Sequence, residues 1–186
     1  MNRILGIALA VGLAVLSGCS TARYDASALR TPINAPYQLA SGDRLRVIVF
    51  GQDNLSNSFS VDGAGNIAMP LVGLVHAQGL TTAELARSLE ARLRQGFLRD
   101  PSVSVEVEAY RPFFVLGEVT SAGQYPFVNG MTVQNAIAVA GGFTPRGAQD
   151  SVDLTRMVQG RPITASVPVT FPVRPGDTIQ VRERFF

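Results

Sequence analysis

The sequence predicts an α+β chain of two small mixed domains that follow a lipoprotein signal peptide. Three observations support this: an apolar leader, a change of pattern at Tyr110-Arg111-Pro112, and short alternating strands around single helices. The length of 186 residues allows one domain of ordinary size or two small ones. The expected ranges are 1–18 for the signal peptide, 19–35 for a lipidated tether, 36–110 for the first domain and 111–186 for the second.

The leader ends in a motif typical of lipid attachment. One positive charge at Arg3 precedes an apolar run from Ile4 to Leu16, and Leu16-Ser17-Gly18-Cys19 follows. This resembles a bacterial lipobox, which implies cleavage before Cys19 and lipidation of that cysteine. Ser20 in place of aspartate points to the outer membrane by the bacterial sorting pattern. The alternatives are an uncleaved anchor helix and an ordinary secretory signal.

The composition argues against a disulfide-stabilised fold and against a nucleic-acid partner. Cys19 is the only cysteine, so no disulfide framework forms within the chain. The 16 basic residues, all arginines, are scattered among 14 acidic ones. Because nucleic-acid binding needs basic residues gathered on one surface, we expect no nucleic-acid partner.

The spacing of apolar residues predicts the strands and the helix of the first domain. Leu45, Val47 and Val49 alternate with more polar residues and predict a strand, and the valines of 103–107 predict another. Leucines four residues apart predict a helix over 82–95, with Thr81 or Thr82 as its cap and Gly96 as its stop.

The stretch 61–82 is rich in turn residues. Gly63 and Gly65 are expected to bracket a tight turn. Ile67, Met69 and Leu71 alternate as a half-buried strand does. The stretch contains no concentration of catalytic residue types, and so we interpret it as scaffold.

The second domain shows a similar succession of short elements. We expect a strand over 113–119 interrupted by Gly117, a turn at 121–124 and a strand over 125–128. A helix from Val133 should end at Gly141-Gly142. The remaining expected elements are a hairpin of 151–157 and 161–169 around Gln159-Gly160, and a closing strand within 173–181.

One short pattern occurs in both domains. The pattern is Gly-Asp-x-aliphatic-x-Val, and it begins at Gly42-Asp43 in the first domain and at Gly176-Asp177 in the second. A glycine in such a turn supplies positive φ, and the aspartate accepts backbone N–H bonds. We therefore expect both domains to use the same turn leading into a strand. The residues expected to set turns are Gly42, Asp43, Asp62, Gly65, Pro70, Gly117, Gly141, Gly142, Gly176 and Asp177.

A catalytic or cofactor site is hard to assemble from this sequence. His76 is the only histidine, which excludes metal sites with two imidazoles. Glu106 and Glu108, two apart on a strand, share a face that we expect to be solvated. No phosphate-binding glycine loop is present. We expect no enzyme activity, no cofactor and no metal.

The ordered motifs resemble a known family. After the lipobox come Tyr37-x-Leu39-x-x-Gly42-Asp43, then Val61-Asp62-x-x-Gly65-x-Ile67-x-Met69-Pro70-x-x-Gly73, then Gly79-Leu80-Thr81. This order resembles the outer-membrane polysaccharide export proteins, the Wza-type capsule translocon family. The segment Phe114-Val115-Leu116-Gly117-Glu118-Val119 and the helix ending Ala140-Gly141-Gly142 resemble their SLBB domain, a β-grasp-like module.

The resemblance implies a lipid-anchored ring on the periplasmic face of the outer membrane. Such a ring conducts capsular polysaccharide or exopolysaccharide from an inner-membrane copolymerase complex without bond chemistry. Long members of the family add SLBB repeats and a C-terminal amphipathic helix, whereas here Val181–Phe186 directly follows the closing strand. Six residues cannot cross about 30 Å of hydrocarbon as a helix, and so we expect reliance on a separate outer-membrane barrel.

Two other functions remain as alternatives. One is a monomeric periplasmic glycan-binding lipoprotein, for which the second domain alone would suffice. The other is a hydrolase or lyase acting on the polymer. It would need paired acids in a cleft, for which the only candidates are Asp43, Asp62 and Asp177.

Overall fold

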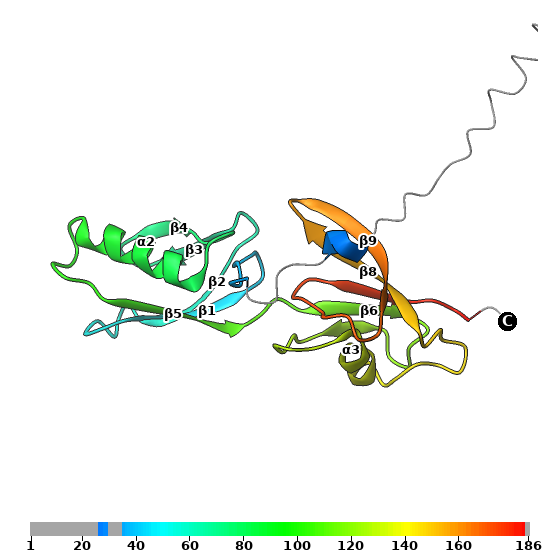
Figure 1. The fold of residues 1–186 in the computed structure, drawn as a ribbon. Coiled ribbons are helices and arrows are strands. Elements are labelled where there is room, and N and C mark those ends of the chain that lie inside the picture. The colour runs from blue at the N-terminus through cyan, green and yellow to red at the C-terminus, as the bar shows by residue number, and fades with distance from the viewer. Residues whose placement is uncertain (1–25, 30–34, 185–186) are drawn as a thin grey trace, which may run out of the picture.

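The computed structural model describes residues 26–29 and 35–184. They form two units that lie end to end (Figure 1). The first unit comprises residues 35–110, and the second comprises residues 26–29 and 111–184. The expected signal peptide, Cys19 and most of the expected tether lie outside the described residues. The predicted fold class, α+β with two small mixed units, is confirmed.

The first unit is a three-stranded antiparallel sheet covered on one face. The strand order is β2-β1-β5. Helix α2 and a separate hairpin of β3 and β4 lie over the face that carries the buried side chains (Figure 1). The bounds are β1 Arg44–Val49, β2 Asn57–Ser60, β3 Asn66–Met69, β4 Gly73–His76, α2 Thr82–Arg94 and β5 Val103–Ala109.

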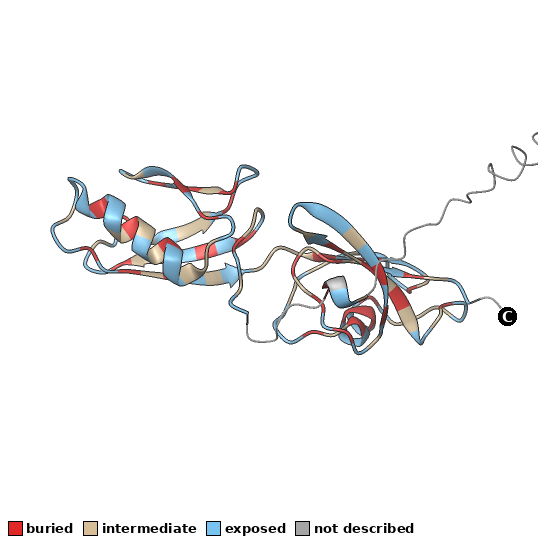
Figure 2. Ribbon diagram, turned by 45° about the horizontal axis from the view of Figure 1, so that its top comes forward, coloured by how far each residue is buried: buried red, intermediate tan, exposed pale blue. Residues whose placement is uncertain are grey.

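Helix α2 forms where the leucine spacing predicts it. Thr81 is the N-cap: its side chain accepts from the backbone N–H of Glu84, whose carboxylate accepts from the Thr81 backbone. Every leucine of the predicted stripe is fully buried against the sheet. Gly96, with φ of +111°, follows the last turn. Figure 2 shows the resulting buried stripe along α2.

The hairpin of β3 and β4 corrects two expectations. Gly65 has a φ of +80°, whereas Gly63 is not among the residues with positive φ, so only one glycine is required by backbone conformation. Ile67 and Met69 are buried as expected, but Leu71 is 63% exposed with a φ of +66°. The chain turns at 70–72, so the strand ends at Met69 and Leu71 cannot continue its alternation.

The second unit is built on a five-stranded sheet with the order β7-β6-β10-β8-β9. The pair β10 and β6 is parallel, and the other pairs are antiparallel. Helix α3 packs against its buried face, and its N-cap Thr132 forms a capping box with Asn135. The bounds are β6 Phe113–Gly117, β7 Gly123–Tyr125, α3 Val133–Val139, β8 Ser151–Val158, β9 Arg161–Pro168 and β10 Thr178–Val181.

Most elements of the second unit match the sequence pattern, and one does not. The hairpin of β8 and β9 turns at Gln159-Gly160, both with positive φ, as expected. The expected turn at 121–124 and strand at 125–128 are shifted, because β7 spans Gly123–Tyr125. Antiparallel pairing with β6 sets this position: Gln124 lies opposite Phe114 and Gly123 opposite Val115.

Part of the expected tether belongs to the second unit. Ala26–Leu29 forms a short 3-10 helix, η1, that contacts β9. Leu29 is 1% exposed and lies in the core of the second unit. Its carbonyl accepts a 2.7 Å bond from Nη1 of Arg156. The sequence pattern gave no sign of this element, because four residues show no periodicity.

Gly117 ends β6 at a point where no side chain fits. Its φ is +85°, and a Cβ built there would overlap the carbonyl oxygen of Val181 on β10. Gly130 has a similar φ of +82° but no atom within 4 Å of such a Cβ. The two glycines therefore share a positive φ of similar size and differ in the space around them.

We predict that Gly117→Ala destabilises the second unit more than Gly130→Ala does. The left-handed conformation costs each alanine about 1–2 kcal/mol. Displacing the backbone of β10 should add roughly 1–3 kcal/mol at Gly117 alone. Urea unfolding of both variants, followed by circular dichroism, measures the difference. Equal free energies of unfolding for the two variants would contradict this account of the β6–β10 contact.

Candidate functional site at the junction of the two units

The two Gly-Asp turns have the same backbone structure. In the first, the N–H of Asp43 donates to the Ala40 carbonyl at 3.1 Å, and Gly42 has a φ of +92°. In the second, Asp177 donates to the Arg174 carbonyl at 3.1 Å, and Gly176 has a φ of +83°. Both turns are therefore four-residue turns that require glycine at the third position.

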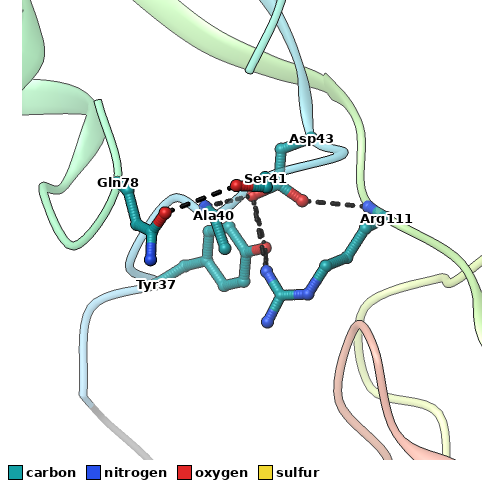
Figure 3. A network of polar contacts seen from close by, with 6 residues as sticks. All are labelled: Tyr37, Ala40, Ser41, Asp43, Gln78 and Arg111. Carbon is teal, nitrogen blue, oxygen red and sulfur yellow. Dashed lines mark hydrogen bonds and ion pairs between the residues drawn. The ribbon is translucent and has the colours of Figure 1, made fainter. Parts of the chain in front are cut away.

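Asp43 is fully buried and is the centre of a polar network (Figure 3). Its Oδ2 accepts from the Tyr37 hydroxyl at 2.7 Å and from the Ala40 N–H at 2.8 Å. Its Oδ1 accepts from the Arg111 N–H at 2.9 Å. The guanidinium of Arg111 lies 3.7 Å from Oδ2 and donates to the Tyr37 hydroxyl at 2.9 Å. Burial, and next its bond to Asp43, raises the pKa of Tyr37 far above its usual value.

Asp177 is held by an arginine from β8. Nε and Nη2 of Arg156 donate to its two carboxylate oxygens at 2.9 and 2.7 Å. The Arg174 N–H donates to Oδ2 at 2.7 Å, as the Ala40 N–H does to Asp43. Burial raises the pKa of the Asp177 carboxyl, and the bonds from Arg156 and Arg174 act in the opposite direction. This pair is buried inside the second unit, since Asp177 is 1% exposed.

Arg111 lies between the two turns. A Cβ added at Gly42 would be 3.3 Å from Cβ of Arg111, and one added at Gly176 would be 2.6 Å from its Nε. The Gly176 N–H also donates, at 3.0 Å, to the carbonyl of Pro112, which follows Arg111 in the sequence. Both glycines therefore give Arg111 room, and the arginine connects the turn of one unit with that of the other.

Aromatic side chains extend the junction beside this network. The ring of Tyr110 lies edge-on to Tyr37 at 4.9 Å and to Phe127 at 5.4 Å between centroids. Edge-to-face pairs of this kind add about 0.5–1.5 kcal/mol each beyond their burial. Tyr37 belongs to the first unit and Phe127 to the second, so Tyr110 packs against both.

The remaining turn residues lie away from the junction or on its margin. Oδ1 of Asp62 accepts from the N–H groups of Ala64 and Asn66 at 2.9 and 2.8 Å, which closes the turn before β3. Gly65 lies against Gln78, whose Cβ would be 2.5 Å from an added Cβ. Pro70 is exposed in the turn between β3 and β4.

Gly141 and Gly142 end helix α3. Both have positive φ, and their N–H groups donate to the carbonyls of Ala138 and Ile137 at 3.0 and 2.9 Å. Gly141 also lies against the side chain of Thr120. These glycines satisfy the last carbonyls of a helix, which is a structural role.

Among the residues that the structure describes, the acidic side chains considered as candidates do not form an acid–base pair for catalysis. The carboxylate of Asp43 accepts hydrogen bonds from Tyr37, Ala40 and Arg111, and that of Asp177 accepts from Arg156 and Arg174. Glu106 and Glu108 are exposed, and Glu108 forms an ion pair with Arg44 at 2.9 Å. Over residues 26–29 and 35–184, no group of three or more histidine, cysteine, aspartate and glutamate side chains could hold a metal ion.

His76 is exposed on β4, with Nδ1 3.4 Å from Oδ1 of Asn66. Within the described ranges, no helix is both long and apolar enough to span a bilayer.

Three partners of the turns were missed by the sequence reasoning. Arg156 has the same parity on β8 as the buried Val152 and Leu154, and this parity is a signal of a buried arginine. Tyr37 was expected only as part of the family motif and Arg111 only as part of the domain boundary, and no local pattern indicated that either residue contacts Asp43.

Comparisons with known proteins match both units in order. Residues 31–108 match the polysaccharide biosynthesis/export protein family, and residues 112–165 match the SLBB domain. The chain is 35% identical over 138 residues to the exopolysaccharide production protein ExoF of Rhizobium meliloti strain 1021, covering 73% of this chain and 32% of ExoF. It is 26% identical over 159 residues to the polysialic acid transport protein KpsD of Escherichia coli, covering 84% of this chain and 27% of KpsD. The chain thus spans about a third or less of the length of these relatives.

We predict that Arg156→Met is strongly destabilising, whereas Arg44→Met is nearly neutral. Losing Arg156 leaves the buried Asp177 carboxylate without its partner, which typically costs about 3–5 kcal/mol. The Arg44–Glu108 pair is exposed, and pairs of this kind contribute about 0–1 kcal/mol. Urea unfolding of both variants measures these costs.

A double variant completes this comparison. Arg156→Met combined with Asp177→Asn removes the uncompensated charge, and it should recover part of the lost stability. If Arg156→Met unfolds at the same urea concentration as Arg44→Met, the Arg156–Asp177 pair does not stabilise the second unit.

Proposed function

Since the chain belongs to the polysaccharide export protein family, we propose that it takes part in exporting a capsular polysaccharide or exopolysaccharide across the cell envelope. The observation that carries this proposal is the ordered match of an export domain and an SLBB domain over residues 31–165. ExoF is named for exopolysaccharide production and KpsD for polysialic acid transport. The matching family is named for polysaccharide biosynthesis and export.

The state of the carboxylates supports transport without bond chemistry. A glycoside hydrolase needs one acid and one carboxylate free to face the same sugar. In this chain Asp43 and Asp177 bind backbone N–H groups and arginines inside two separate turns, and Asp62 closes a third turn. Their roles are architectural, so the chain would contribute shape and surface to the passage of polymer.

The proposed setting is the periplasmic face of the outer membrane. Lipidation at Cys19 would anchor the chain there, and the motif Leu16-Ser17-Gly18-Cys19 supports this. Further parts of the proposal are a homo-oligomeric ring, an inner-membrane polysaccharide copolymerase as a partner, and a separate outer-membrane barrel as the pore. We also propose residues 36–110 and 111–186 as the two domains, which is supported by two separate cores.

Deleting the gene in its host tests the export proposal. We expect surface polysaccharide to be lost, because the polymer has no route outward, while its inner-membrane synthesis continues. The measurement is surface polysaccharide on intact cells alongside lipid-linked intermediates in membrane extracts. A plasmid copy of the wild-type gene is the control and should restore export. Normal surface polysaccharide in the deletion strain would sink the proposal.

A further inference from the structure

The five-stranded sheet of the second unit has one face that the core leaves uncovered. Buried side chains of neighbouring strands lie opposite one another on the inner face, as Val115, Ile179 and Leu154 do. Because successive side chains of a strand point to opposite faces, the residues between them lie on the outer face. Helix α3 packs against the inner face, where its buried side chains join the core.

One row of side chains crosses this outer face from edge to edge. The strand register places its members opposite one another on all five strands. With strands about 4.8 Å apart, the row is roughly 19 Å long. Its members are Gln124 on β7, Phe114 on β6, Thr178 on β10, Thr155 on β8 and Thr164 on β9.

The row combines an aromatic ring with hydroxyl and amide groups. Phe114 is 38% exposed, although an apolar ring of this size is usually buried. The hydroxyls of Thr155 and Thr164 are 2.8 Å apart and hydrogen-bond to each other, so both are held in position at the outer surface. None of the five side chains of the row carries a charge.

A second row lies beside the first and is also close to neutral. It consists of Leu116, Gln180, Asp153 and Ser166. Its one charged member, Asp153, lies 3.5 Å from Nε of Arg182, and Nη2 of this arginine donates to Ser166 at 3.0 Å. Leu116 is 41% exposed beside Phe114 on β6, and Met157 on β8, which has the same parity as Thr155, is 60% exposed. The face therefore carries apolar side chains on β6 and β8 among its hydroxyl and amide groups.

We propose that this outer face binds a segment of a glycan chain. A sugar ring has an apolar C–H face and a hydroxyl edge, which match the aromatic side chain on β6 and the hydroxyl groups on β8 and β9. The near-neutral charge of the face suits a hydroxyl-rich polymer and gives no anchor for a strongly anionic one. That the bound glycan is the exported polymer rests on the proposed function.

A second copy of the chain fits the face less well. The core of a stable protein interface is a continuous apolar and aromatic patch, whereas here exposed Met157 on β8 is separated from Phe114 and Leu116 on β6 by the polar side chains of β10. The threonine hydroxyls satisfy each other in place and would need new partners under a flat protein surface. We therefore assign the face to glycan, and self-association is an outcome that the experiment can detect.

Binding of the full chain to polysaccharide purified from its host tests the assignment. Isothermal titration calorimetry should show binding by the wild-type chain and roughly tenfold weaker binding by Phe114→Ala, the size of one lost aromatic contact. The double variant Thr155→Val with Thr164→Val removes both hydroxyls without leaving one unpaired, and should also weaken binding. Phe97→Ala is the matched control, since Phe97 is 47% exposed in the first unit.

Four outcomes would overturn the assignment. One is a wild-type chain that does not bind, and a second is binding unaffected by both the Phe114 and the threonine variants. The third is equal weakening by Phe97→Ala. The fourth is a change of assembly size in light scattering with Phe114→Ala, which would make a second copy the occupant. The deletion phenotype is independent of all four, so the export proposal stands or falls separately. Thermal melting of each variant shows whether it is folded. If Phe114→Ala does not fold, the double variant Thr155→Val with Thr164→Val still tests the assignment.

Discussion

The contact between Asp43 and Arg111 is the constraint on which the arrangement of the two units depends. The carboxylate is fully buried and accepts three hydrogen bonds, one of them from the backbone of Arg111. The arginine side chain then lies against Gly176 in the second unit. A buried carboxylate with missing donors is costly, so any rotation about this point has to break well-formed bonds. Two glycines without side chains make the close approach possible.

The path of the chain strengthens this junction. Ala26–Leu29 packs on the second unit, residues 35–110 then form the first unit, and Arg111 begins the return to the second. Arg156 takes part in this arrangement, because it binds the Leu29 carbonyl and Asp177 at once. The chain therefore contacts the second unit both before and after it builds the first. For a protein whose proposed role is to shape a passage, a defined angle between units is a functional property.

The sequence predicted what local patterns determine. Strand β1, helix α2 and the hairpin of β8 and β9 follow from alternation, leucine spacing and turn residues, and all three lie where expected. It did not predict the exposure of Leu71 or the position of β7. The first depends on where a hairpin turns, and the second on pairing with β6, so neither is encoded within a short window.

The sequence predicted the two turns of the candidate site but not the arginines that bind their aspartates. The two turns were expected from Gly42-Asp43 and Gly176-Asp177, because a glycine and an aspartate in such a turn have known local roles. Their arginine partners come from other parts of the chain, and only tertiary structure identifies them. The docking of Ala26–Leu29 was missed for the same reason. Long-range contacts, which give this molecule its shape, leave the weakest trace in its sequence.

The distance between the two units in solution tests the central claim most directly. Spin labels at exposed Arg87 in the first unit and exposed Arg161 in the second, with Cys19 replaced by serine, allow pulsed electron paramagnetic resonance to measure it. We predict one narrow distance distribution. It should broaden or shift with Arg111→Ala, because this variant keeps the backbone bond to Asp43 but loses the side chain that donates to Tyr37 and lies against Gly176. Arg146→Ala, which removes an arginine paired with Glu183 within the second unit, should leave it unchanged. A broad distribution without any substitution at Arg111, or one that Arg111→Ala does not alter, would contradict a junction fixed by Asp43 and Arg111.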